Sequence, residues 1–119
     1  MAALRDAILA VSDIRSEVVD VPEWGVKVEV RGLTARARAE LLQASMDGRG
    51  TLNFAKAYPL LVISCALDPE THEPIFEMAD REALEAKSGA ALERVALAAA
   101  RLSGLDGEAE ARFQSKTAK

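Results

Sequence analysis

Residues 17–31, EVVDVPEWGVKVEVR, predict an antiparallel β-hairpin. In the second strand, residues 26–31, valines alternate strictly with charged side chains, which is typical of a strand with one buried side and one solvent-facing side. The first strand is expected over residues 17–21. Pro22 to Gly25 supply the turn between them, because proline fixes φ and glycine tolerates a positive φ.

Two helices are expected after the hairpin. The first begins at Thr34, whose hydroxyl can cap the free N–H groups of the first turn, and runs through Met46. This helix is expected to end at residues 47–50, Asp-Gly-Arg-Gly, which form a flexible loop. The apolar segment 52–67 is interpreted as a buried helix that Pro59 kinks or restarts, with a buried strand over residues 60–67 as the alternative.

The remaining pattern completes a small α+β domain. Short helices are expected over residues 2–11, 79–87 and 89–103, with a turn at residues 68–74. The predicted fold class is α+β and mainly α-helical, with a small N-terminal antiparallel β-hairpin packed with a bundle of about four to five helices. One domain is expected over residues 1–105, followed by a polar, flexible tail over residues 106–119.

The amino-acid composition limits the functions and locations that are expected for this protein. The 119 residues carry a net charge of −4, which argues against general nucleic-acid binding. Only 4% of the residues are aromatic, so the core is thin and would gain stability from a partner or from self-association. The single cysteine, Cys65, lies in an apolar run and is expected to be a packed core thiol. That run is too short to cross a bilayer and residues 1–10 do not resemble a secretory leader, so a cytoplasmic location is expected.

The helix predicted from Thr34 to Met46 has an unusual distribution of apolar residues. A surface helix needs only one apolar stripe, but this one carries two on roughly opposite sides. Both stripes could be covered within the domain, or one could face the domain and the other a partner chain. The first stripe consists of Leu33, Ala37, Leu41 and Ala44, and the second of Ala35, Ala39, Leu42 and Met46.

Two further side chains are candidate partner contacts. Leu97 falls between Glu93 and Arg101 on the predicted 89–103 helix, away from its apolar arc, although one exposed leucine is ordinary on any protein. Trp24, the only tryptophan, lies at the hairpin turn. It either caps the end of the sheet or, if exposed, anchors an interface.

Residues with the spacing of a catalytic or metal site are not found. His72, the only histidine, lies in an acidic turn bounded by prolines and is expected to be solvated. Glu82 and Glu85 are interpreted as a solvated helix face, and residues 48–50 lack the spacing and lysine of a phosphate-binding loop. The sequence therefore predicts a protein that is not an enzyme and uses no cofactor or metal.

Two segments together resemble the small tail assembly chaperones of long-tailed bacteriophages and prophages. In that family a hairpin with a Val-Pro-Glu-Trp-Gly-like turn precedes a Leu-Thr helix start, as in residues 19–34. The second segment has Ile75-Phe76, an acidic helix, a Lys-Ser joint at residues 87–88 and the ending Ser103-Gly104-Leu105. The resemblance covers most of residues 17–105, and the order and spacing of its pieces carry its specificity. The turn at residues 68–74, with two prolines and a histidine, departs from the family's pattern.

The resemblance implies a helper in virion assembly with no catalytic motif. Such proteins bind the helical tape measure protein, keep it soluble, help recruit tail tube subunits and leave before the particle is complete. They commonly exist with a longer form of the same chain made by ribosomal frameshifting. Two other functions remain open: a structural tail-tube or head–tail adaptor subunit that stays in the virion, and a small regulatory or toxin-neutralising protein.

Overall fold

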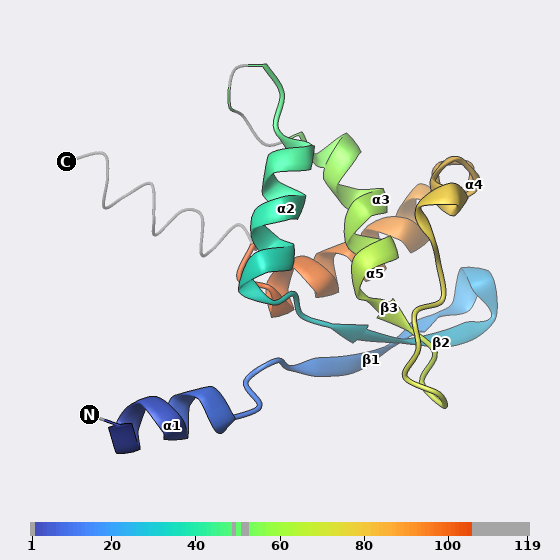
Figure 1. The fold of residues 1–119 in the computed structure, drawn as a ribbon. Coiled ribbons are helices and arrows are strands. Elements are labelled where there is room, and N and C mark those ends of the chain that lie inside the picture. Colours follow the sequence, from blue (N-terminus) through green and yellow to red (C-terminus); the bar gives the residue numbers. More distant parts are fainter. Residues whose placement is uncertain (1, 49, 51–52, 106–119) are drawn as a thin grey trace.

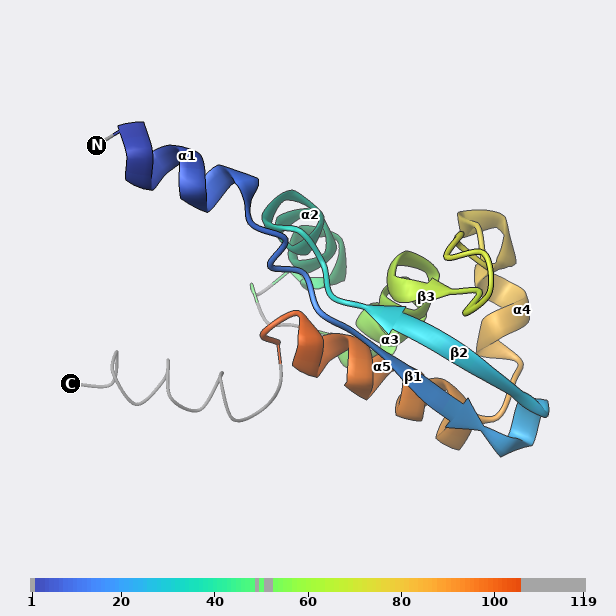
Figure 2. The same ribbon diagram turned by 90° about the horizontal axis from the view of Figure 1, so that it is seen from below.

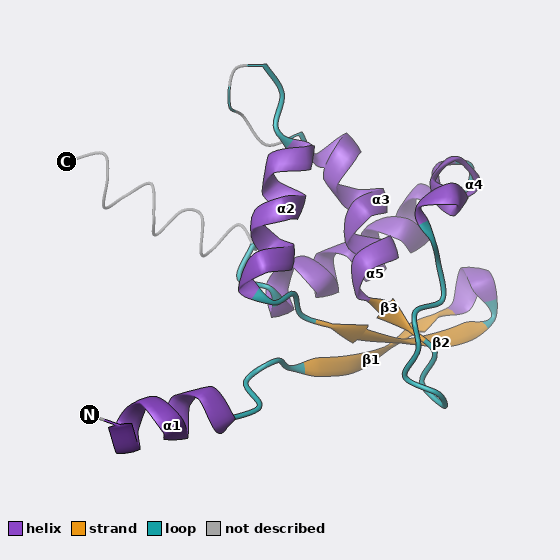
Figure 3. Ribbon diagram, in the orientation of Figure 1, coloured by secondary structure: helices purple, strands orange, loops and turns teal. Residues whose placement is uncertain are grey.

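A computed structural model describes residues 2–48, 50 and 53–105. A three-stranded antiparallel sheet forms one layer, in the order β1 (Ser16–Val21), β2 (Val26–Arg31), β3 (Ala66–Leu67). Helices α2 (Ala35–Ser45), α3 (Phe54–Cys65) and α5 (Gly89–Leu102) lie on one side of the sheet (Figures 1 and 3). The predicted fold class, α+β and mainly α-helical, is confirmed. The predicted tail over residues 106–119 lies outside the described residues.

The hairpin has the predicted strands and turn. Strand β1 spans Ser16–Val21 and β2 spans Val26–Arg31, paired so that Val19 lies opposite Val28. A 3-10 turn, η1, Pro22–Trp24, joins them, and Gly25 closes it with φ 68°, a conformation that glycine adopts without strain. The predicted alternation of β2 is incomplete. Val28 and Val30 are buried as expected, but Glu29 between them is buried too, and Val26, next to the turn, is exposed.

Helices α2 and α3 follow, each capped by a side chain. Helix α2 spans Ala35–Ser45, and the Thr34 hydroxyl accepts a hydrogen bond from the Ala37 N–H, as predicted. Helix α3 spans Phe54–Cys65 with Pro59 inside it, and the Asn53 side chain caps its first turn. The alternative of a strand over residues 60–67 is wrong except at its end, where β3 spans only Ala66–Leu67 and pairs with β2.

The last third of the described chain forms a short helix and a long one. The predicted 79–87 helix is shorter than expected: a 3-10 turn, η2, Met78–Asp80, leads into α4, Arg81–Glu85. Helix α5 spans Gly89–Leu102, with the Ser88 hydroxyl capping it. Ser88, with ψ 125°, has a non-helical backbone and caps α5, so α4 and α5 are separate helices.

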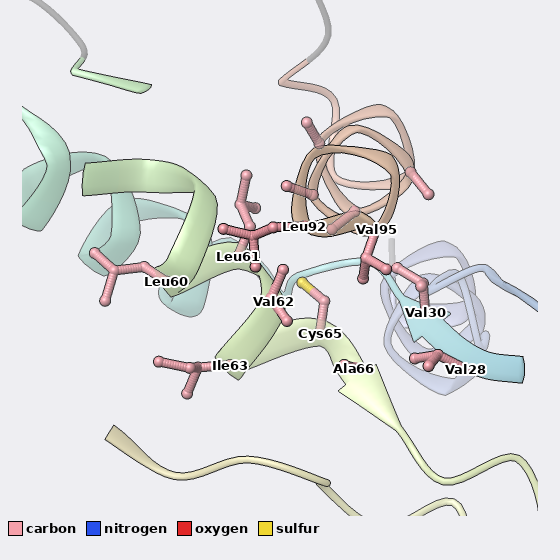
Figure 4. Packing of buried hydrophobic residues seen from close by; sticks show 14 of the residues in the cluster. Val28, Val30, Leu60, Leu61, Val62, Ile63, Cys65, Ala66, Leu92 and Val95 are labelled. Atoms are coloured by element: carbon pink, nitrogen blue, oxygen red, sulfur yellow. The ribbon is translucent and has the colours of Figure 1, made fainter. Parts of the chain in front are cut away.

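The core lies where α3 and α5 cross the helix-facing side of β2 (Figure 4). Leu61, Val62 and Cys65 from α3 meet Leu92 and Val95 from α5, above Val28 and Val30 of the sheet. Five alanines of α5 are also buried, so the helix can approach its neighbours closely. The core contains no buried Phe, Tyr or Trp among the described residues, in agreement with the thin core expected from composition.

One predicted element packs differently from the rest. Helix α1, Ala2–Ala10, forms as expected, but none of its residues is buried, and it extends away from the domain (Figures 1 and 2). A short helix of this kind has little stability of its own in water. Its apolar side therefore has no cover within the described chain.

Candidate partner-binding surfaces

The outer face of α2 carries the second predicted stripe. Leu41 and Ser45 face the core, while Leu33 and Ala37 are half-buried beside them. Ala44, predicted on the inner stripe, is exposed, and the polar Ser45 takes the buried position instead. The prediction is wrong at this position: α2 packs against α3, and the buried residues of α2 are Leu41 and Ser45, one helical turn apart.

The second stripe is largely open to solvent. Ala35 and Ala39 are exposed, and Leu42 is half-buried. Met46, predicted as the last helical residue, instead follows the end of α2 with an extended backbone and is 43% exposed. We call these four residues the outer α2 face. Its small alanines leave room for the backbone of another helix to approach, and methionine adapts to irregular partners. Of the two interpretations of this helix, the exposures favour an uncovered stripe over one that is covered within the domain.

Trp24 lies at the hairpin end and is not a free anchor. Its ring is half-buried and packs against the core cluster, as expected for a side chain that caps the sheet. Its indole Nε1 is buried and has no hydrogen-bond acceptor in the described chain. An exposed interface anchor would present both the ring and this N–H to solvent.

Leu97 lies in an apolar groove that sequence reasoning missed. The leucine is 48% exposed on α5, and the groove, of about 560 Å³, runs between β1, α3 and α5. Phe54 and Tyr58, one helical turn apart on α3, line its other wall with ring centroids 5.8 Å apart. The spacing of these two aromatics is visible in the sequence, but their exposure is not, because the apolar run around them predicted a fully buried helix.

Two ion pairs border the groove where β1 and η1 meet α5. Arg94 donates two hydrogen bonds to the Glu23 carboxylate, the second at 2.9 Å, and these bonds lower the pKa of Glu23 to about 2. Arg101 pairs with Glu17. The edge of the groove thus carries charges of both signs, each matched by its neighbour.

The predicted contacts do not form one continuous site. The structure places Trp24 at the sheet end, the outer α2 face on the second helix, and Leu97 in the groove. The groove includes Leu41 of α2, but none of the four residues of the outer α2 face lines it. The sequence therefore identified residues on two separate open surfaces, and the structure adds Phe54, Tyr58 and Leu105 to the second.

The side chains that could take part in chemistry, Cys65 and His72, have structural roles. Cys65 is buried, and burial raises the pKa of its thiol to about 12. His72 is not simply solvated as predicted: its Nδ1 lies 2.6 Å from Oε1 of Glu29, a carboxylate that is only 7% exposed. The histidine lowers the pKa of Glu29, against the opposing effect of burial.

Neither a metal site nor a membrane span is found in the described part of the chain. Across residues 2–48, 50 and 53–105, no group of three or more His, Cys, Asp or Glu side chains is arranged to hold a metal ion. None of the described helices is long and apolar enough to cross a membrane.

The fold and these surfaces define a small α+β protein with uncovered apolar faces. The chain belongs to the phage tail assembly chaperone family, whose sequence model matches residues 3–116. A solved structure of the bacteriophage HK97 tail assembly chaperone has the same fold, with a TM-score of 0.60 and 23% sequence identity over 86% of this chain and 95% of that one. No curated protein sequence matches this chain significantly. The expectation drawn from residues 17–105 is thus confirmed at the level of the family.

Proposed function

We propose that this chain is a non-enzymatic tail assembly chaperone that binds the tape measure protein and helps recruit tail tube subunits in the host cytoplasm. Family membership supports the general role. The observation that carries the specific one is the outer α2 face, on which Ala35, Ala39 and Met46 are solvent-exposed. Burying such a face against an apolar helix would protect both surfaces from aggregation.

A helix of the tape measure protein would pack against the outer α2 face as one helix packs against another in a protein core. Ala35 and Ala39, one helical turn apart, leave a shallow depression on the surface of α2, and the side chains of a partner helix can fit into it. Leu42 and Met46 add the larger contacts at the far end. Because these contacts are apolar and unspecific in shape, one surface can bind successive stretches of a long amphipathic helix.

Co-expression with a tape measure protein encoded in the same phage or prophage genome tests the proposal. The wild-type chain should keep that protein soluble and be retained with it in a pull-down. The double variant Leu42→Glu/Met46→Glu should keep its fold by circular dichroism and lose at least about tenfold in affinity, since two buried apolar contacts are replaced by charge. Wild-type binding without any effect of the double variant would exclude the outer α2 face as the site.

A matched control variant tests whether a loss of binding comes from the changes in the outer α2 face or only from the added negative charge. Arg36→Gln with Gln43→Glu changes the net charge by the same −2, at exposed positions on the polar edge of the same helix. This variant should bind as the wild type does. Recovery of the chain at ring stoichiometry from mature virions would instead indicate a structural tail-tube or head–tail adaptor subunit.

A further inference from the structure

The groove between β1, α3 and α5 lies beside Leu105, the last residue that the structure describes. Leu105 lines the groove and packs against the core. A Schellman turn ends α5 at this point: the Leu105 N–H donates to the carbonyl oxygen of Ala100 at 2.7 Å, and Gly104 has φ 74°. The chain therefore continues into residues 106–119 from one end of the groove.

The groove needs an apolar occupant. Phe54 is 46% exposed on its α3 wall and Leu97 is 48% exposed on its α5 wall. The space between the walls, about 560 Å³, is open to solvent rather than enclosed, so a segment of chain can enter from the side. A segment with one large apolar side chain and small residues beside it would cover both walls.

The residues that follow Leu105 have this composition. Residues 106–116 are Asp-Gly-Glu-Ala-Glu-Ala-Arg-Phe-Gln-Ser-Lys, in which Phe113 is the only large apolar residue. Ala109 lies four residues before it, which is the spacing of neighbours on one side of a helix. An aromatic ring is also a favourable contact for the rings of Phe54 and Tyr58 on the α3 wall.

The lengths of chain on the two sides of Leu105 match. Leu97 lies eight residues before Leu105, and Phe113 lies eight residues after it. Eight residues of helix span about 12 Å. A helical segment that turned back after Leu105 and ran along α5 would therefore bring Phe113 level with Leu97, inside the groove.

Charged side chains follow a complementary order along the two segments. Exposed residues at four-residue spacing on α5 are an acidic, an apolar and a basic one: Glu93, Leu97 and Arg101. In the antiparallel direction, Glu108 meets Arg101 and Lys116 meets Glu93, so unlike charges flank the apolar contact. Arg101 already pairs with Glu17, and its guanidinium has donors enough for a second carboxylate.

We propose that residues 106–116 bind in the groove of their own chain, antiparallel to α5, with Phe113 between the α3 and α5 walls. The segment then covers Phe54 and Leu97 in the free protein, so a partner that uses the groove has to displace it. This contact lies within one chain and does not depend on the outer α2 face or on the tape measure protein.

Nuclear magnetic resonance of the full chain tests the contact directly. The ring protons of Phe113 should show nuclear Overhauser effects to the methyl groups of Leu97. A sample that mixes isotope-labelled and unlabelled chains separates contacts within one chain from contacts between chains. Absence of these effects, or their presence only between chains, would overturn the proposal.

Hydrogen exchange measures how firmly the segment is bound. The protection factors of the amides of residues 110–113 should be at least about fivefold higher in the wild type than in Ala109→Asp, which places a charge in the apolar contact. Ala111→Asp is the matched control, because residue 111 falls on the opposite side of a helix from residues 109 and 113. Its protection factors should match those of the wild type.

Equal protection in the two variants would contradict binding through the side of the segment that carries Ala109 and Phe113. The amides of residues 60–65 in α3 serve as an internal check of the fold, since both substitutions lie outside the domain core. Their protection factors should be the same in the wild type and in both variants.

Discussion

Glu29 shows how a residue on the outward-facing side of a strand becomes buried. Its place in the alternation of β2 assigns it to the side facing away from the helices, yet it is only 7% exposed because the 68–74 turn lies over it. His72 adopts φ 62°, a left-handed conformation that is uncommon outside glycine, and its imidazole contacts the carboxylate. The turn that departs from the family pattern thus has a structural role.

Removing the histidine should destabilise the fold in a pH-dependent way. The pKa of Glu29 is lower in the folded chain than its ordinary value of 4.5, so the pairing stabilises the fold above that pH. This contribution is lost as the pH falls through the lowered pKa of the folded state. His72→Ala should therefore lower the urea midpoint at neutral pH, and the difference from wild type should shrink in acid as Glu29 is protonated.

The neighbouring Glu70→Ala variant is the control for this measurement. Glu70 is exposed in the same turn, and its backbone N–H, which the substitution leaves in place, donates to the Asp68 side chain at 2.8 Å. Its urea midpoint should match that of the wild type. A difference between His72→Ala and wild type that is equally large in acid would show that the loss comes from the turn backbone and not from the hydrogen bond between His72 and Glu29.

Contacts between elements depend on a glycine at the junction of β2 and α2. Gly32 lies against the end of α5, where a Cβ atom would sit 2.6 Å from the carbonyl oxygen of Leu102. The adjacent Leu33 N–H donates to the Ser103 hydroxyl at 2.9 Å. The backbone before α2 therefore lies directly against the backbone at the end of α5, and this close approach leaves no room for a side chain at Gly32.

Gly32→Ala should lower the free energy of unfolding by about 1–3 kcal/mol, because the obstructing atom is backbone and cannot rotate away. Gly89→Ala is the matched control: no atom lies within 4 Å of its added Cβ, and it opens α5. That substitution should be neutral or stabilising by up to about 1 kcal/mol. Chemical denaturation of both variants measures the difference, and equal stabilities would show that the β2–α2 junction can shift.

At the scale of the whole molecule, the stability of the domain should not depend on helix α1. Deletion of residues 2–10 removes no buried side chain, so it should change the free energy of unfolding of the monomer by less than about 1 kcal/mol. Leu84→Ala, at a side chain that is 3% exposed, should cost about 2–5 kcal/mol. Urea denaturation at concentrations where both chains are monomeric measures both. A loss on deletion as large as that of Leu84→Ala would mean that α1 packs on its own domain.

Local patterns sufficed for most of the elements of this chain. Alternating valines, a Pro-Glu-Trp-Gly turn and capping residues such as Thr34 act over a few positions, so the hairpin, α2 and α5 follow from short stretches of sequence. The family resemblance also rested on ordered local pieces. The length of α3, the burial of Ser45 in place of Ala44 and the shortness of β3 did not follow, because each depends on which helix lies beside which.

Which apolar surfaces remain open was decided by packing alone. The sequence shows that Ala35, Leu42, Phe54 and Ile8 are apolar and share faces with other apolar residues, but periodicity is the same whether a face is covered or bare. Only the arrangement of α3 and α5 on one face of the sheet leaves the groove and the outer α2 face in solvent and α1 without a neighbour (Figure 1). Exposure is a property of the assembled layers, whereas helix and strand formation is largely a property of neighbouring residues.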